Sequence, residues 1–188
     1  MAKLYFRYST MAAGKSLDLL KVAYNYAERN QQVLIFSSTK DNRYGTGKVV
    51  SRTGLEKEAV SLDEYFDIYN YVSRLKEKPD CILTDEAQFL TKAQVWQLTE
   101  VVDQLNIPVI CYGLRCDYRG EPFEGSKYLM AYAETIEEIK TICHCGKKAT
   151  MNLRLVEGKA VYKGEQVIIG GNEKYMAVCR KHYKAGKG

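Results

Sequence analysis

The sequence predicts an α/β fold, in which a mostly parallel sheet is flanked by helices and followed by a small zinc-binding module. Strand-like apolar runs alternate with amphipathic helical patterns over about the first 140 residues. After that point the composition changes, and closely spaced cysteine and histidine residues appear. Repeated strand–helix alternation implies right-handed βαβ units and a sheet covered on both faces. We therefore expect two domains, spanning residues 1–140 and 141–188.

The expected elements follow from the apolar spacing. Apolar residues that recur every three or four positions predict helices, and continuous apolar runs predict buried strands. Pro79 and Pro108 mark the ends of two helical patterns, and the stretch between Lys40 and Lys57 has the turn chemistry of a flexible loop. The order is strand 3–8, helix 17–27, strand 32–36, loop 40–57, helix 62–75, strand 81–85, helix 95–105, strand 107–113, loop 114–126 and a hairpin-like stretch 150–169.

The composition indicates the class of protein and its cellular environment. With 188 residues, 46% hydrophobic and 27% charged, the chain has the composition of a soluble globular protein. No apolar run approaches the roughly 20 residues of a membrane span, and the start of the chain lacks a signal peptide's apolar core. Six cysteines without a targeting signal indicate a reducing cytoplasm. The net charge of +5 is weak evidence for nucleic acid, because phosphate-rich small substrates explain it equally well.

A phosphate-binding loop follows the first strand. Residues 9–16 read Ser-Thr-Met-Ala-Ala-Gly-Lys-Ser and open a helix, which matches the G-x-x-x-x-G-K-S pattern except at Ser9. The loop and the helix N-terminus offer backbone N–H groups to a polyphosphate, Lys15 adds a mobile cation, and Ser16 can ligate Mg²⁺. Serine tolerates positive φ poorly, so we expect Ser9 to change the geometry at the start of the loop.

A carboxylate motif lies about seventy residues after Lys15, where the apolar run 81–84 ends in Asp85 and Glu86. Ligands of open α/β sheets bind at the carboxyl ends of the strands, so Asp85 can hold Mg²⁺ directly or through water. Glu86 points elsewhere and is either a functional group or a surface carboxylate at a helix start. Both motifs together predict an ATP or GTP site. The site comprises Ser9, Thr10, Met11, Ala12, Ala13, Gly14, Lys15, Ser16, Asp85, Glu86, Ala87 and Gln88, with magnesium at Ser16 and Asp85.

The carboxyl-terminal segment has the spacing of a structural zinc module. Cys143 and Cys145 form one close pair, and Cys179 and His182 form another. Together they complete a tetrahedral Cys₃His site. His144 is a competing ligand, and reduced cysteines without metal are the alternative. A segment with so little apolar core of its own generally requires such a metal.

The assembled pattern resembles the type II thymidine kinases over essentially the whole chain. The resemblance rests on residues 11–16, 85–89 and 112–120, the zinc quartet, and the segment Val167-Ile-Ile-Gly-Gly-Asn-Glu-Lys-Tyr175. The chain departs from that family at Ser9 and in the short Cys143–Cys145 spacing. The resemblance implies transfer of the γ-phosphoryl group of Mg-ATP to the 5′-hydroxyl of thymidine, giving dTMP for nucleoside salvage and DNA synthesis. It also implies a cytosolic homotetramer with structural zinc, inhibited by dTTP.

The resemblance also implies residue roles. Lys15 neutralises the transferring phosphate, Glu86 is the general base on the 5′-hydroxyl, and Arg43, with Asp41 nearby, reaches the reacting phosphate. Met11, Phe89, Leu114 and Tyr118 match apolar positions of the nucleoside pocket. A lasso-like loop reads the thymine edge with its backbone and places its tyrosine by the sugar. The matching residues of that loop are Val167, Ile168, Ile169, Gly170, Gly171 and Tyr175.

Two other classes of protein share single features with the chain. Asp85-Glu-Ala-Gln88 also occurs in DEAD-like nucleic-acid-dependent ATPases, but these motors normally need a second nucleotide-binding domain for which 188 residues leave no room. A zinc-stabilised nucleic-acid-binding module would leave the phosphate loop unexplained. The sequence therefore favours a kinase that acts on neither nucleic acid nor membranes.

Overall fold

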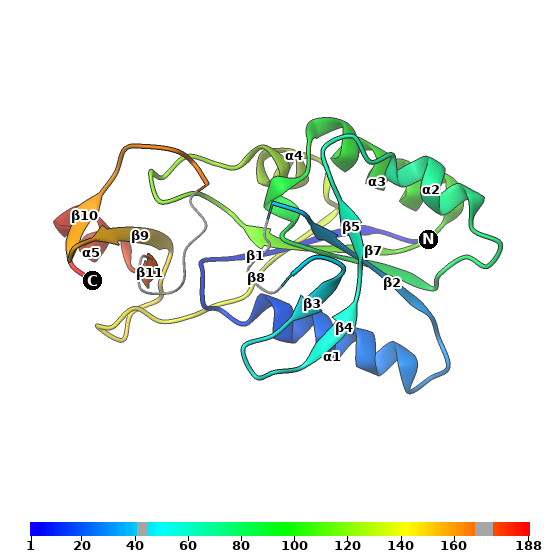
Figure 1. Cartoon of the computed structure of the whole chain (residues 1–188), viewed down its shortest axis with the longest axis horizontal. Helices are drawn as coiled ribbons and strands as arrows, with labels where there is room; N and C mark the ends of the chain where they lie inside the picture. Colours follow the sequence, from blue (N-terminus) through cyan, green and yellow to red (C-terminus); the bar gives the residue numbers. More distant parts are fainter. Residues whose placement is uncertain (41–44, 168–174) are drawn as a thin grey trace.

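The computed structural model describes residues 1–40, 45–167 and 175–188. Its centre is a six-stranded sheet with the order β5-β2-β6-β7-β1-β8, in which every neighbouring pair is parallel (Figure 1). The predicted parallel α/β fold is thus confirmed. The strands are β1 Leu4–Ser9, β2 Val33–Ser38, β5 Val60–Leu62, β6 Cys81–Asp85, β7 Val109–Leu114 and β8 Thr135–Glu138.

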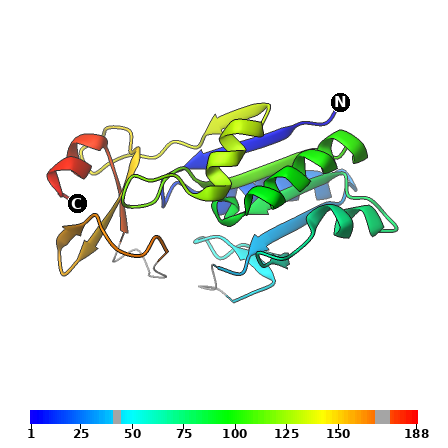
Figure 2. The ribbon, with the colours of Figure 1, turned by 90° about the horizontal axis from the view of Figure 1, so that it is seen from above.

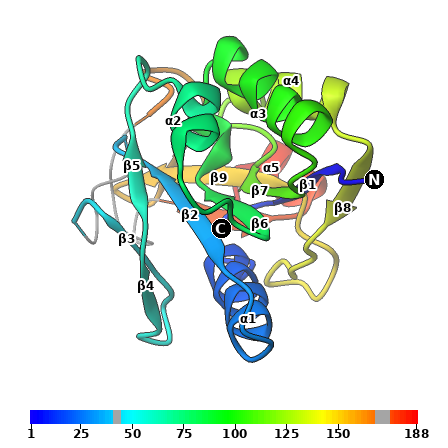
Figure 3. The ribbon, with the colours of Figure 1, turned by 90° about the vertical axis from the view of Figure 1, so that its right-hand side faces the viewer.

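Helices cover both faces of this sheet (Figure 3). Helix α1 (Lys15–Ala27) packs on one face, where Leu19 belongs to the same buried cluster as Leu83 and Tyr112. The other face carries α2 (Ile68–Arg74), α3 (Lys92–Leu105) and α4 (Glu124–Tyr132). Leu83 belongs to the core under α1, and its neighbour Ile82 belongs to the core under α2, α3 and α4. The two side chains lie on different faces because successive strand residues point to opposite sides of the sheet. The continuous apolar runs of the sequence follow from this two-sided burial.

The helix predicted over residues 62–75 is wrong in its first half. Val60–Leu62 forms the edge strand β5, in which Val60 pairs with Phe36 of β2. Helix α2 begins only after Asp67, whose carboxylate accepts a hydrogen bond of 2.9 Å from the Asn70 N–H. The prediction failed because apolar residues recur at helical spacing from the end of β5 into α2. The Asp67 side-chain cap determines where the helix begins.

The flexible loop predicted between residues 40 and 57 is also partly wrong. An antiparallel ribbon forms from β3 (Lys48–Val50) and β4 (Glu56–Glu58). It is stabilised by Val49, which is only 2% exposed and packs with the α1 residues Leu19 and Leu20. Three-residue strands carry too little periodicity to be recognised in a sequence.

The carboxyl-terminal module lies beyond the carboxyl ends of the sheet strands, at the end of the molecule opposite the N-terminus (Figures 1 and 2). It contains a small antiparallel sheet of order β10-β9-β11 and a short helix α5 (Arg180–Ala185). Its strands are β9 Met151–Val156, β10 Lys159–Val161 and β11 Tyr175–Val178. The predicted hairpin is therefore present between residues 151 and 161. In the described part of the chain, no helix combines the length and apolarity needed to cross a bilayer.

Candidate active site

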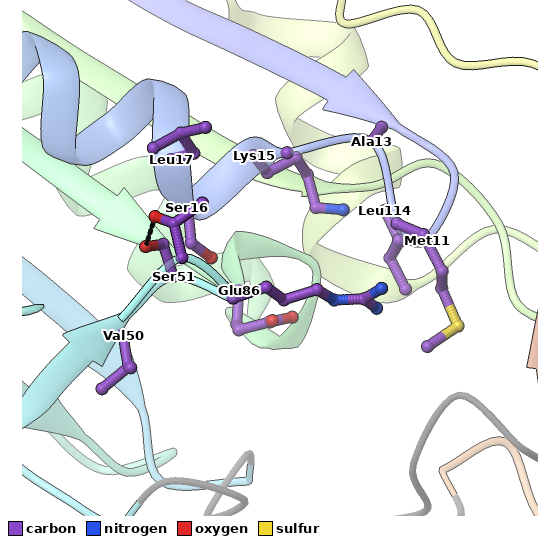
Figure 4. Close-up of a pocket in the computed structure, with 13 residues that line it drawn as sticks. Met11, Ala13, Lys15, Ser16, Leu17, Val50, Ser51, Glu86 and Leu114 are labelled. Atoms are coloured by element: carbon purple, nitrogen blue, oxygen red, sulfur yellow. Dashed lines mark hydrogen bonds between the residues drawn. The ribbon is translucent and has the colours of Figure 1, made fainter. Parts of the chain in front are cut away.

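The phosphate-binding loop joins β1 to α1 at the carboxyl edge of the sheet, and its lysine points into a cavity (Figure 4). The turn is made by Ala12 at φ +59° and Gly14 at φ +80°. Lys15 is 9% exposed, and its Nζ donates to Ser9 Oγ and to the Thr10 carbonyl, both at 3.1 Å. The loop thus presents a fixed cation beside the N-terminus of a helix, the arrangement that binds phosphate.

Ser9 does not adopt the positive φ that serine tolerates poorly. It is the last residue of β1 and pairs in register with Leu114, so the left-handed conformations fall on Ala12 and Gly14 instead. Its hydroxyl donates to the Thr10 carbonyl at 2.7 Å while accepting from Lys15. Serine at the first glycine position therefore acts as a positioning group for the lysine.

The two predicted magnesium ligands lie together although they are 69 residues apart in the chain. Ser16 Oγ donates to Asp85 Oδ2 at 3.0 Å, and the other oxygen, Asp85 Oδ1, accepts from the Glu86 N–H at 3.0 Å. Asp85 is 5% exposed at the end of β6. A serine hydroxyl and a buried carboxylate at the mouth of a phosphate loop are oxygen donors of the kind that Mg²⁺ prefers, so the pair fits this ion.

Glu86 is half-buried and lines the same cavity as Lys15, a position that favours a functional group over a surface carboxylate. It adopts a left-handed backbone, φ +51°, between β6 and the 3₁₀ turn η1 (Ala87–Phe89). A left-handed conformation is uncommon for a residue with a Cβ and marks a position held by its surroundings. One carboxylate oxygen accepts a short hydrogen bond from Gln88 Nε2. That bond fixes the orientation of the carboxylate.

Close packing holds η1 in place. Gln88 is 1% exposed, and its side-chain oxygen accepts from the Leu114 N–H at 3.1 Å. A Cβ at Gly113 would lie 2.9 Å from the Gln88 backbone nitrogen, and one at Gly125 would lie 2.3 Å from the Ala87 carbonyl. Both glycines are required because backbone approaches backbone there. Glu86 therefore directly precedes a turn that close packing holds rigid.

The predicted pocket residues fall into two groups. Met11 and Leu114 line the cavity with Glu86 (Figure 4). Phe89 packs edge-on against Phe123, with the ring centroids 5.7 Å apart. Tyr118 is 2% exposed, and its ring centroid lies 6.2 Å from that of Tyr175. The fold thus brings together aromatic residues of the core domain and of the carboxyl-terminal module.

The polar loop after β7 holds the chain that leads to Val167. The Tyr118 hydroxyl donates to the Glu165 carbonyl at 2.9 Å, and the Gln166 side chain donates to Asp117 Oδ2 at 3.1 Å. A third bond of 3.3 Å runs from Arg119 Nη1 to the Gly164 carbonyl. The predicted site residues Ile168, Ile169, Gly170 and Gly171 lie outside the described residues, as do Asp41 and Arg43.

The four predicted zinc ligands converge. Their ligand atoms all lie within 4.8 Å of one another. His182 Nδ1 is 3.3 Å from the Cys143 sulfur and 3.5 Å from the Cys179 sulfur, and the Cys145 and Cys179 sulfurs are 3.9 Å apart. A tetrahedron with zinc–sulfur bonds of about 2.3 Å has edges of about 3.8 Å, so the donor set fits zinc.

The electrostatics around Cys143 favour a thiolate. Burial opposes ionisation of the thiol, but hydrogen bonds from backbone groups of Cys145 and Cys179, followed by His182, lower its pKa to about 6. His144 stacks on His182, with ring centroids 4.2 Å apart, and is not part of the converging set. The Cys₃His quartet could therefore hold a zinc ion, since thiolates are the form that binds the metal.

Two residues near the site were missed by the sequence reasoning. Asn152 of β9 is 4% exposed; its side chain accepts from the Met11 N–H at 2.8 Å and donates to the Cys116 carbonyl at 3.0 Å. It thereby ties the carboxyl-terminal module to the phosphate loop. Arg52 lines the cavity from the turn between β3 and β4. Neither belongs to a motif, so no signal in the sequence could have found them.

A parallel sheet with a phosphate loop at its carboxyl edge, a buried lysine and a serine–aspartate pair defines the class of P-loop nucleotide-binding α/β proteins. The family model described as thymidine kinase matches residues 2–183, so the chain belongs to the thymidine kinase family. It is 56% identical to the thymidine kinase of Lactococcus lactis over 184 residues, 97% of each chain. It is 56% identical to that of Mannheimia succiniciproducens, covering 100% of this chain and 98% of the other, and 55% identical to that of Vibrio vulnificus, covering all of both.

Proposed function

We propose that this chain transfers the γ-phosphoryl group of ATP to the 5′-hydroxyl of thymidine, giving dTMP and ADP in nucleoside salvage. Membership of the thymidine kinase family supports the reaction class, which is the phosphorylation of thymidine. The observation that supports the site is that the phosphate loop and Glu86 line the same cavity. Phosphoryl transfer depends chiefly on positioning and charge neutralisation, and a cavity of this kind supplies both.

In the proposed mechanism the phosphate loop binds the triphosphate through its backbone N–H groups and Lys15. Magnesium would be held by Ser16 and Asp85 and would neutralise phosphate charge when bound. Glu86 orients the 5′-hydroxyl and accepts its proton late in the transfer. Its hydrogen bond from Gln88 fixes the orientation of the carboxylate in the cavity. Arg43 is proposed to reach the reacting phosphate.

The nucleoside is proposed to bind between the core and the carboxyl-terminal module. Met11, Leu114, Phe89 and Tyr118 are its apolar neighbours in this proposal. The loop from Val167 to Tyr175, including Ile168, Ile169, Gly170 and Gly171, reads the thymine edge. Contacts among the described residues support this location, because Tyr118 and Asp117 hold the segment 164–166 and Tyr118 approaches Tyr175.

The wider organisation of the protein is likewise a proposal. We place the domain boundary between residues 140 and 141, where β8 has ended and the zinc ligands begin. A zinc ion held by Cys143, Cys145, Cys179 and His182 would have a structural role, since four protein ligands would leave no open position for chemistry. Assembly as a homotetramer, feedback inhibition by dTTP and a cytoplasmic location complete the proposal.

An assay of ADP formation separates this function from the alternatives. ADP release should require thymidine and should be unchanged by single-stranded DNA. Release driven by DNA without thymidine would instead indicate a nucleic-acid-dependent ATPase. An absence of release under both conditions, combined with DNA binding, would indicate a binding module without catalysis.

Cys179→Ser is expected to remove bound zinc and to weaken thymidine binding more than ATP binding. Structural zinc binding is coupled to folding, and Cys179 belongs to the small core of the module, with Leu153 and Val178. The proposed thymidine loop lies between the two ligand pairs, whereas Lys15 and Asp85 belong to the main sheet domain. Zinc content by metal analysis and both affinities by titration calorimetry measure the effect.

Cys116→Ser is the matched control, because Cys116 lies outside the converging ligand set. It should keep stoichiometric zinc and normal affinity for both substrates. Wild-type protein without stoichiometric zinc, or a Cys179→Ser protein with normal thymidine affinity, would contradict the structural role of the metal.

A further inference from the structure

We propose that Arg52 is a second cation of the phosphate site and binds the phosphate chain of ATP. The inference rests on the proposed function and extends it to a residue outside every motif of the sequence. Among the described residues that line the cavity, Lys15 and Arg52 are the basic ones and Glu86 is the acidic one. The cavity is thus built from the phosphate loop on one side and the β3–β4 turn on the other.

The backbone that carries Arg52 is fixed by a tight turn. The Ser51 N–H donates to the Leu55 carbonyl at 2.8 Å, and the Gly54 N–H donates to the Ser51 carbonyl at 3.0 Å. Gly54 is left-handed at φ +85°, and the hydroxyls of Ser51 and Thr53 are 2.8 Å apart. Ser51 is 4% exposed. Arg52 therefore occupies the first central position of a closed turn, so its backbone is held in place.

The turn is fixed relative to the phosphate loop because the ribbon packs on α1. Val49, three residues before Arg52, is buried against Leu19 and Leu20, one turn beyond Lys15 and Ser16. The same helix thus positions both the phosphate loop and the turn. This packing keeps Arg52 at the cavity that the phosphate loop lines.

The chemistry of the cavity favours a further cation beside Lys15, in addition to the proposed Mg²⁺ and Arg43. A triphosphate brings several negative charges, and Lys15 is already bonded to Ser9 Oγ and the Thr10 carbonyl. A guanidinium can bind phosphate oxygens through two parallel hydrogen bonds, which an ammonium cannot do. Arg52 is solvent-exposed, so binding a phosphate costs its side chain little desolvation. Arginines that neutralise the transferring phosphate recur in enzymes of this chemistry.

The test is ATP binding and steady-state kinetics of Arg52→Gln and Arg52→Lys in the full-length protein. Removing a charge-assisted contact should weaken ATP binding, measured by calorimetry, and raise KM for ATP by about 10- to 100-fold. The KM for thymidine should stay within about twofold. Arg52→Lys should recover part of the ATP affinity, because it keeps the charge and loses the paired geometry.

Lys48→Ala is the matched control, since Lys48 lies on the same ribbon, is exposed and pairs with Glu56 at 3.1 Å. It should leave both KM values unchanged. Unaltered ATP affinity in Arg52→Gln would overturn the inference, and so would a loss of kcat with normal ATP affinity. If Lys15→Ala weakens ATP binding while Arg52→Gln does not, only the role of Arg52 fails. If the wild-type protein binds no ATP, the proposed function itself fails.

Discussion

Lys15→Ala is expected to reduce turnover by about 10²–10³-fold, the effect of removing one preorganised charge contact from a transition state. Lys15 is held in the cavity by Ser9 Oγ and the Thr10 carbonyl, so its ammonium stands ready before ATP binds. No neighbouring side chain of the phosphate loop carries a positive charge that could replace it. The rate of thymidine-dependent ADP formation at saturating substrates measures the loss.

Lys21→Ala is the control for Lys15. Lys21 is an exposed lysine of the same helix and pairs with Asp18 at 2.6 Å. Its removal should leave turnover unchanged, because surface ion pairs contribute little. Near-normal turnover in a folded Lys15→Ala protein would count decisively against the assignment of the phosphate site.

Glu86→Gln is expected to lower turnover by about 10²–10⁴-fold while ATP affinity stays nearly normal. The amide has the shape of the carboxylate and can still accept the hydrogen bond from Gln88, so η1 should keep its conformation. The amide cannot take the proton of the 5′-hydroxyl, which is the step assigned to Glu86. Single-turnover rates together with calorimetric ATP titration separate chemistry from binding.

The control for Glu86→Gln is the same substitution at a glutamate outside the cavity. Glu100→Gln changes a residue of α3, on the face of the sheet opposite α1, and should turn over normally. If Glu86→Gln lost ATP affinity but turned over normally at saturation, Glu86 would be a binding residue and the proposed general base would be wrong.

Local patterns were sufficient to predict the layout of the core and its family. The runs around residues 3–8, 32–36, 81–85 and 107–113 are strands of one parallel sheet, because a strand buried on both faces must be apolar throughout. The phosphate loop is recognisable because its chemistry needs specific residues at fixed spacing within a single turn. The thymidine kinase family, predicted from five motifs in order, is confirmed by the match over residues 2–183.

Prediction was poorest where packing outweighs local preference. Leu62 begins a helical spacing, yet it is the last residue of the edge strand β5, because β2 offers that strand a hydrogen-bonding partner. The short strands β3 and β4 form because Val49 can be buried against α1. Such contacts join residues distant in sequence and leave no periodic trace in either segment.

The sequence by itself determined the fold class, the family and the identity of the motif residues, since each depends on residue type and local spacing. Only the tertiary structure decided which side chains share one cavity. In the folded chain, Ser16 is hydrogen-bonded to Asp85, and Ser9 is hydrogen-bonded to Lys15. Asn152 is hydrogen-bonded to the phosphate loop, and Arg52 lines the cavity beside that loop. These placements are fixed by parallel strand pairing and by the packing of the ribbon on α1, which depend on the whole chain and not on any single segment of it.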